Sequence, residues 1–335
     1  MKLRPLGRTG VRVPVLCLGT MTFGLQCDEE TSFQILDRAY EFGVDFLDTA
    51  DVYPLGGSVE TVGRTEEIIG RWMRERVNRD RIFLATKCRA PVGPGPNDHG
   101  LSRYHIQRTV EESLHRLGTD VIDLYQTHAF DPHTPIDETL RAFDDLVRSG
   151  KVRYIGCSNY PAWRVAEALG TSERLGLPRY ETIQPRYNLL YREIETELLP
   201  VARAMKLSVL VYNPLAGGFL TGKYQRGESP REGTRFTLGG AGRVYQHRYW
   251  DDIQFEAVET LRKEADARGL SLASVAIAWV LRQPGVTSAI FGASRPDQLD
   301  AAWSALDLEF DEDLSKVCDT LWWRLPRRPV AEGYR

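Results

Sequence analysis

The stretch FLDTADVY, residues 46–53, joins a short apolar run to two polar residues. Its apolar lead-in, opened by Val44, predicts a buried strand, with Asp48 at the strand's end and Tyr53 on the following loop. A buried carboxylate needs a positively charged partner, because an unpaired buried charge is costly. A tyrosine donates a proton near pH 7 only if its pKa is lowered, which a nearby cation does. The stretch therefore predicts a lysine and a polar neighbour at equivalent strand ends.

Similar strand-like runs recur along the whole chain. They are short and largely apolar or β-branched, as buried parallel strands are. The eight runs are VLCLG (15–19), VDFLD (44–48), RIFLAT (81–86), VIDLYQ (121–126), VRYIG (152–156), ETIQ (181–184), SVLVY (208–212) and SAIF (288–291).

Helical patterns lie between these runs. In residues 102–117, apolar side chains recur at helical spacing, with Ser102 as the expected N-cap and Gly118 just past the end. In residues 135–149, Thr134 is the expected N-cap. The other predicted helices span 29–42, 66–76, 161–170, 193–206, 251–268, 271–282 and 296–306.

Eight strands that alternate with helices predict an α/β fold, a (β/α)8 TIM barrel, formed by one domain over residues 1–335. An open doubly wound sheet is the main alternative, but no G-x-G-x-x-G follows the first strand. Residues 2–14 predict an N-terminal β-hairpin. Two long loops, 89–100 and 213–250, each follow a strand, which places them on the C-terminal face where barrel active sites lie.

Composition and charge exclude several classes of protein. The chain has 335 residues and a net charge of −3, with no basic block, so nucleic acid is not an expected partner. The longest apolar run, around 272–281, is far shorter than the ~20 residues that span a bilayer, and the N-terminus lacks a signal-peptide pattern. Five cysteines without a CxxC motif predict reduced thiols in a cytoplasmic protein, with no metal site.

Polar residues follow the next two predicted strands. Lys87 comes just after RIFLAT, and His128 just after VIDLYQ. Singly, each has a structural explanation: a carboxylate can cap a turn, a lysine can be a solvated charge, and a histidine can be hydrogen-bonded in the core. Their occurrence on three consecutive strand ends, together with Asp48 and Tyr53, instead predicts a catalytic group.

These four side chains suit proton transfer to a carbonyl oxygen. Lys87, paired with Asp48, is expected to lower the pKa of Tyr53, which then donates a proton to the oxygen. His128 donates a hydrogen bond to the same oxygen as charge develops. No member of the set attacks carbon, so the hydride must come from a cofactor bound beside it.

The motifs FLDTADVY, ATK, QTH, IGCSN and VYNPLAGGFLTGKY, with flanking LGRTG (6–10) and GASRPDQL (292–299), resemble the aldo-keto reductase family over essentially the whole chain. The resemblance implies NAD(P)H-dependent reduction of aldehydes and ketones, with Asp48, Tyr53, Lys87 and His128 as the catalytic tetrad. It also implies that Ser158, Asn159 and Gln184 hold the nicotinamide carboxamide and that Tyr212 stacks on the ring. The full cofactor set so implied is Gly19, Thr20, Met21, Ser158, Asn159, Gln184, Tyr212, Asn213, Pro214, Leu215, Gly217, Leu220, Lys223, Gly292, Ser294, Arg295 and Gln298.

Cofactor preference depends on the segment 292–298. In the family the adenosine 2′-phosphate binds here, and the start of the predicted helix 296–306 favours an anion. Arg295 can bind a phosphate bidentately, which favours NADPH while leaving NADH open. The family's usual Glu-Asn pair on the adenine side is replaced by Ala301-Ala302.

Several alternatives stay open. GGFLTGKY has the spacing of a P-loop, but Tyr224 stands where magnesium binding needs Ser or Thr. The expected substrate is a small carbonyl compound, for which an oxo-sugar, a sugar nucleotide and a simple aldehyde are alternatives. A cofactor-bound regulatory subunit of the channel β-subunit type is the alternative to an enzyme, and a homo-oligomer is left open. The long loops carry polar and aromatic residues that suit a hydroxylated or anionic ligand: Asn97, His99, Arg235, Arg243, Tyr245, His247, Arg248 and Trp250.

Overall fold

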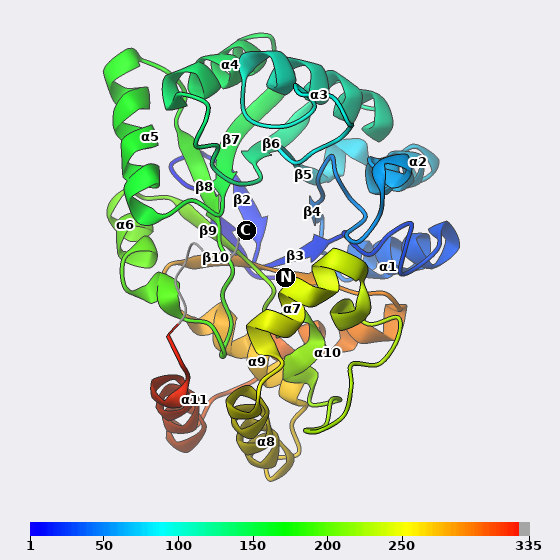
Figure 1. Ribbon diagram of the computed structural model, residues 1–335, viewed down its shortest axis with the longest axis vertical. Helices are drawn as coiled ribbons and strands as arrows, with labels where there is room; N and C mark the ends of the chain where they lie inside the picture. The colour runs from blue at the N-terminus through cyan, green and yellow to red at the C-terminus, as the bar shows by residue number, and fades with distance from the viewer. Residues whose placement is uncertain (328–335) are drawn as a thin grey trace.

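Eight parallel strands close into a barrel in the computed structural model, which describes residues 1–327. Residues 328–335 of the predicted domain lie outside the described part. The strands follow the order β10-β3-β4-β5-β6-β7-β8-β9, and helices surround them (Figure 1). All eight predicted strands and the barrel are confirmed. The strands are β3 (Leu16–Gly19), β4 (Phe46–Asp48), β5 (Phe83–Cys88), β6 (Ile122–Thr127), β7 (Val152–Ser158), β8 (Tyr180–Gln184), β9 (Ser208–Tyr212) and β10 (Val286–Gly292).

The predicted N-terminal hairpin plugs the amino-terminal end of the barrel. Strands β1 (Leu3–Pro5) and β2 (Arg12–Pro14) pair antiparallel, and the Gly7 amide between them donates to Ser208 Oγ at 2.7 Å. The hairpin adds apolar side chains to the inner core of the barrel. Among the described residues, the hairpin thus closes one end of the barrel and leaves the carboxyl end for a ligand. The buried residues of this inner core are Leu6, Val13, Cys17, Phe46, Ala85, Leu124, Leu210 and Ile290.

The helices pack their apolar faces on the outside of the barrel and form its larger core. The two ends predicted for α3 are confirmed. Ser102 Oγ accepts from the His105 amide at the start of the helix, and Gly118 ends the helix with φ +62°. The outer helices are α1 (Glu29–Glu41), α2 (Arg64–Arg76), α3 (Arg103–Leu117), α4 (Ile136–Arg148), α5 (Ala162–Leu175), α6 (Leu198–Ala204), α8 (Asp252–Asp266), α9 (Leu272–Arg282), α10 (Asp300–Ala305) and α11 (Glu312–Arg324).

Three helix predictions need correction. Pro135, not Thr134, is the N-cap of α4, because Thr134 Oγ1 donates to Asp131 Oδ2 at 2.7 Å instead. The predicted helix 193–206 is a 3-10 turn, η3 (Glu193–Glu195), followed by α6. Pro200 has no amide hydrogen to bond to residue 196, so one continuous helix cannot form. The predicted helix 296–306 is likewise divided into η6 (Pro296–Leu299) and α10.

The long loop after β9 contains structure that the sequence did not predict. It forms η4 (Ala216–Thr221), η5 (Arg235–Thr237) and the helix α7 (Gly239–Tyr249). Figure 1 shows α7, in yellow, crossing in front of the barrel. The loop thus covers part of the end at which a ligand can enter. Within residues 1–327, no helix has the combined length and apolarity that crossing a membrane requires.

Candidate active site

A buried ion pair lies at the centre of the barrel's open end. Asp48 is the last residue of β4, and Lys87 is the penultimate residue of the neighbouring β5. Lys87 Nζ lies 2.5 Å from Asp48 Oδ1 and 2.7 Å from the Thr49 carbonyl oxygen, and both charged side chains are almost completely buried. Buried charges are retained when they are paired and hydrogen-bonded. The pairing predicted for Asp48 and Lys87 is therefore confirmed.

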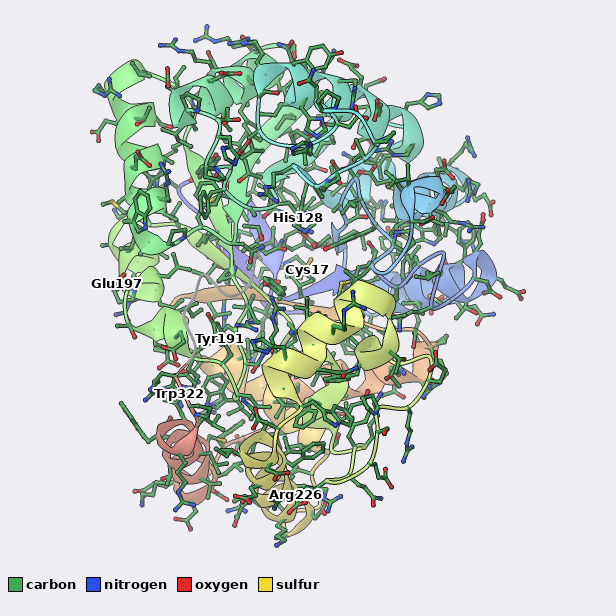
Figure 2. The ribbon with its side chains drawn as sticks, viewed as in Figure 1. Cys17, His128, Tyr191, Glu197, Arg226 and Trp322 are labelled. Carbon is green, nitrogen blue, oxygen red and sulfur yellow. The ribbon has the colours of Figure 1, made fainter. Side chains whose placement is uncertain are left out.

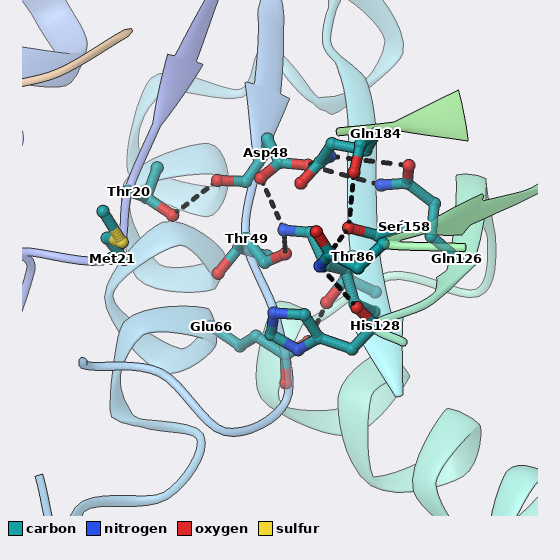
Figure 3. A network of polar contacts seen from close by, with 12 residues as sticks. Thr20, Met21, Asp48, Thr49, Glu66, Thr86, Gln126, His128, Ser158 and Gln184 are labelled. Atoms are coloured by element: carbon teal, nitrogen blue, oxygen red, sulfur yellow. Dashed lines mark hydrogen bonds and ion pairs between the residues drawn. The ribbon is translucent and has the colours of Figure 1, made fainter. Parts of the chain in front are cut away.

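Two glutamines fix the other oxygen of this carboxylate. Asp48 Oδ2 accepts from Gln184 Nε2 at 2.7 Å and from Gln126 Nε2 at 3.3 Å (Figure 3). The Asp48 carbonyl oxygen also accepts from Thr20, through its amide at 3.1 Å and its hydroxyl at 2.9 Å. The carboxylate is thereby held by side chains from β5, β6 and β8. Such a network fixes the position of the Asp48 carboxylate.

Tyr53 lies between the lysine and the histidine. Lys87 Nζ is 5.1 Å from the centroid of the Tyr53 ring, and the His128 and Tyr53 ring centroids are 5.7 Å apart at an interplanar angle of 79°. His128 directly follows β6, and its amide donates to the Cys88 carbonyl oxygen at 2.8 Å. Figure 2 shows His128 near the middle of the barrel opening. The four predicted catalytic side chains therefore converge on one place.

The predicted pKa of Tyr53 needs correction. Burial raises the pKa of Tyr53 above its ordinary value. The charge of Lys87 and its hydrogen bond lower that pKa, as expected, but by less than burial raises it. Burial also lowers the pKa of Lys87, yet the charges of Asp48 and Tyr53 leave it above the usual value. Lys87 is thus a stable cation and Tyr53 a protonated phenol.

His128 is a neutral imidazole. Burial lowers the pKa of His128 to about 3, and the positive charges of Lys87 and Arg89 act in the same direction. A neutral imidazole carries one N–H and can donate one hydrogen bond. His128 Nδ1 is buried without a hydrogen-bond partner among the described residues, so the neighbouring protein does not fix which nitrogen carries the proton.

The predicted carboxamide group is assembled on the next strands. Asn159 has φ +63°, and its Nδ2 donates to the His128 carbonyl oxygen at 2.9 Å and to Ser158 Oγ at 2.8 Å. Ser158 Oγ donates to the Gln184 carbonyl oxygen at 2.8 Å. These contacts join the ends of β7 and β8 to His128. The polar groups of Ser158 and Asn159 therefore lie directly beside the tetrad.

The η4 loop after β9 is shaped by glycine and asparagine. Asn213 has φ +65°, and its Oδ1 accepts from the Gly217 amide at 2.6 Å. Gly217 has φ +70°, and a Cβ there would lie 2.5 Å from the Tyr245 ring. Pro214 and Leu215 lead into this turn, and Tyr212, half-buried, precedes it at the end of β9. The side chain of Leu220 is buried.

A group of positive charges surrounds Lys223. Partial burial lowers the pKa of Lys223, and the charges of Arg295, Arg231 and Arg235 lower it further. Arg235 Nε is buried without a hydrogen-bond partner, and Lys223 forms no ion pair, among residues 1–327. Arg235 Nη1 also lies 3.2 Å from Met21 Sδ. This cluster brings the η4 loop, η5 and the end of β10 together in an arrangement that suits an anion.

The predicted anion site at a helix start needs correction. Arg295 precedes a four-residue 3-10 turn rather than an α-helix, so the helix dipole contributes little there. The Ser294 amide already donates to Gln298 Oε1 at 2.8 Å, and Arg295 forms a two-point ion pair with Asp297 at 3.1 Å. Gly292 is exposed at the end of β10, beside Gly19 of β3. Arg295 is nevertheless exposed and adjacent to the cluster around Lys223.

Comparison with known proteins agrees with this geometry. The model of the Aldo/keto reductase family matches residues 15–322. The chain is 42% identical to an uncharacterized oxidoreductase, YrpG, of Bacillus subtilis, over 96% of each chain.

The chain belongs to the aldo/keto reductase family. It is thus an NAD(P)H-dependent oxidoreductase. Two further relatives are named for other functions. The chain is 38% identical to a probable voltage-gated potassium channel subunit beta of Arabidopsis thaliana, over 92% of each chain. It is 33% identical to the L-glyceraldehyde 3-phosphate reductase of Escherichia coli, over 92% of this chain and 88% of that one.

Two residues of this aldo/keto reductase, Gln126 and Arg89, lie at the site without having been predicted there, and Tyr245 was predicted only as one of several ligand-suited residues of its loop. Gln126 contacts Asp48, but a glutamine inside an apolar strand does not show which way it points. Tyr245 of α7 lies close enough to Tyr53 to affect its pKa, and only its place in a polar and aromatic loop suggested a ligand role. Arg89 lies close enough to His128 to affect the histidine's pKa, and its place directly after a strand was the available signal.

Proposed function

We propose that this reductase converts an aldehyde or ketone to an alcohol, with hydride supplied by NADPH and the proton supplied by Tyr53. The observation that carries the proposal is the position of the Tyr53 ring between a buried cation, Lys87, and a neutral imidazole, His128. A protonated phenol, a stabilising cation and a neutral hydrogen-bond donor are the three groups that carbonyl reduction needs.

Each side chain has a distinct role in the proposed reaction. Tyr53 transfers its phenolic proton to the carbonyl oxygen as negative charge develops there. Lys87 stabilises the tyrosinate that remains, and Asp48 holds Lys87 in place. His128 donates its single N–H to the same oxygen and orients the carbonyl group. Because His128 is uncharged, it does not compete with Tyr53 as the acid.

The residues that would hold the cofactor fit a dinucleotide. The cofactor supplies the hydride when bound. The side-chain amides of Asn159 and Gln184 lie beside the tetrad, where they would hold the carboxamide of the nicotinamide. Lys223 and Arg235 lack acidic partners among the described residues, which supports binding of the diphosphate. Arg295 would hold the 2′-phosphate of NADPH after leaving Asp297, while NADH could bind without that contact.

The proposed substrate class is a small carbonyl compound derived from a carbohydrate. Polar and aromatic side chains of η5 and α7 lie around the barrel opening, and these suit a hydroxylated ligand. The name of one relative, L-glyceraldehyde 3-phosphate reductase, refers to such a compound. A sugar nucleotide is the larger alternative within the same class.

A turnover assay tests the proposed function. NADPH oxidation is followed by absorbance with a panel of simple aldehydes, oxo-sugars and sugar nucleotides, and Tyr53→Phe serves as the matched inactive control. The proposal expects turnover with at least one carbohydrate-derived carbonyl and a loss in the variant. If NADPH binds but none of the carbonyl compounds is reduced, the protein is instead a cofactor-bound regulatory subunit. The channel subunit among the relatives favours that second candidate.

A further inference from the structure

Arg89 occupies an unusual place at the rim of the barrel. It follows the last residue of β5, two positions after Lys87, and therefore lies at the same end of the barrel as the tetrad. Its φ is +126°, a value that residues with side chains rarely adopt. Its carbonyl oxygen accepts from the Gly100 amide at 2.9 Å, which closes the loop 89–100 at its base. Residues held in such conformations cluster at ligand-binding sites.

The charge of Arg89 is not neutralised by any ion pair in the described part of the chain. Arg89 forms no ion pair within residues 1–327, and its Nε is buried without a hydrogen-bond partner there. The neighbouring carboxylate of Asp131 is occupied by the amides of Leu101 and His133 and by the hydroxyl of Thr134. Arg89 contributes to the lowered pKa of Asp131 without reaching bonding distance. Two other largely buried arginines differ, since Arg79 of η2 (Arg79–Arg81) and Arg116 of α3 bond directly to carboxylates.

This cation lies on the His128 side of the site. Its charge acts on His128, whose amide is bonded to the residue before Arg89, at the Cys88 carbonyl oxygen. The cations expected to hold the cofactor's phosphates are a separate group. The charges of Arg295, Arg231 and Arg235 lower the pKa of Lys223, and Arg89 does not belong to this group of cations. Arg89 is therefore a cation separate from the group around Lys223.

We propose that Arg89 binds an anionic group, phosphate or carboxylate, on the carbonyl substrate while His128 and Tyr53 contact the carbonyl oxygen. A guanidinium suits this role because it can donate two parallel hydrogen bonds to either anion. The inference rests on the proposed reductase function and specifies its substrate as an anionic aldehyde or ketone. Arg89 is then a specificity-determining residue that acts through binding rather than through proton transfer.

Two matched substrate pairs test the inference. The first pair is glyceraldehyde 3-phosphate and glyceraldehyde, and the second is succinic semialdehyde and butanal. For each pair, the ratio of kcat/KM, anionic over neutral, is measured in the wild type, Arg89→Gln and Arg89→Lys. Arg141→Gln on the surface of α4 removes the same charge far from the site and is the control. Taking a ratio cancels any effect of Arg89 on His128 that both substrates share.

The expected result is a fall of about 10- to 100-fold in the ratio for at least one pair in Arg89→Gln, the scale of a charge-assisted hydrogen bond. Arg89→Lys should recover part of it, and Arg141→Gln should keep the wild-type ratio. The substrate pair whose ratio of kcat/KM falls shows whether the anion is a phosphate or a carboxylate. Turnover with unchanged ratios in Arg89→Gln would overturn the inference alone. If the wild type reduces other carbonyl compounds of the wider panel but none of these four, the inference alone is overturned, and if it reduces no compound of the panel, the proposed function itself is overturned.

Discussion

Lys87 Nζ lies 2.5 Å from Asp48 Oδ1 in a part of the barrel where neither side chain is open to water. Removing one partner of such a pair leaves the other charge buried without compensation. This destabilises the fold more than breaking an ion pair on the surface. The same pair places a fixed cation beside Tyr53. Stability and the proposed proton transfer thus depend on the same contact.

We predict that Lys87→Met abolishes reduction and lowers the free energy of unfolding by about 3–5 kcal/mol, the usual cost of breaking a buried pair. The methionine keeps most of the side-chain volume but leaves Asp48 unpaired. Urea denaturation of the wild type and the variant measures the change. Adding Asp48→Asn should restore part of the stability but no activity. A variant that unfolds like the wild type would show that the pair does not stabilise the fold.

Two glycines of the long loop after β9 allow a matched test of its packing. Gly217 and Gly227 have φ of +70° and +83°, so alanine at either position costs about 1–2 kcal/mol through the backbone alone. Only at Gly217 would the new Cβ collide with the ring of Tyr245, whereas Gly227 has open space around it. We expect Gly217→Ala to lose more stability than Gly227→Ala and also to lose affinity for substrate. Thermal unfolding and KM measure the two effects, and equal behaviour of the variants would contradict the role of this contact.

The pKa of His128 predicts a pH dependence of stability. Its folded value of about 3 lies below its ordinary value of 6.5, so the unfolded chain binds the proton more readily. The resulting stabilisation is complete above about pH 6.5 and is lost as the pH falls toward 3. His128→Gln should flatten the dependence of the unfolding free energy on pH in this interval. His115→Gln, at an exposed position on α3, is the control and should keep the wild-type profile.

Cofactor preference is tested at Arg295 and its partner. Arg295→Ala should weaken NADPH binding by about 10- to 100-fold and leave NADH binding nearly unchanged, because only NADPH carries the 2′-phosphate. Asp297→Asn should act in the opposite direction, since it releases Arg295 from a competing ion pair. Titration of both cofactors by quenching of tryptophan fluorescence gives the affinities. Equal losses for the two cofactors in Arg295→Ala would remove the main support for NADPH.

The sequence was sufficient to predict the barrel and the convergence of the tetrad. Parallel strands bring their carboxyl ends to one edge, so Asp48, Lys87 and His128 could be placed together from their positions after three strands. Helix α7 was missed because it begins with GGAG, a poor helix-forming sequence that tertiary packing stabilises. The pKa of Tyr53 was predicted in the wrong direction because the degree of burial depends on how the loops fold. The pairing of Arg295 with Asp297 is a choice between exposed side-chain conformations, which sequence spacing does not specify.

The proton-donor role of Tyr53 is the central claim, and Tyr53→Phe tests it most directly. The substitution removes one hydroxyl group and little volume, so the affinity for NADPH should be nearly unchanged. We predict a loss in kcat for carbonyl reduction of about 10²–10⁴-fold, the usual contribution of a general acid. The measurement is kcat at saturating NADPH, with cofactor affinity determined on the same preparation. A kcat close to that of the wild type would contradict the mechanism proposed for this reductase.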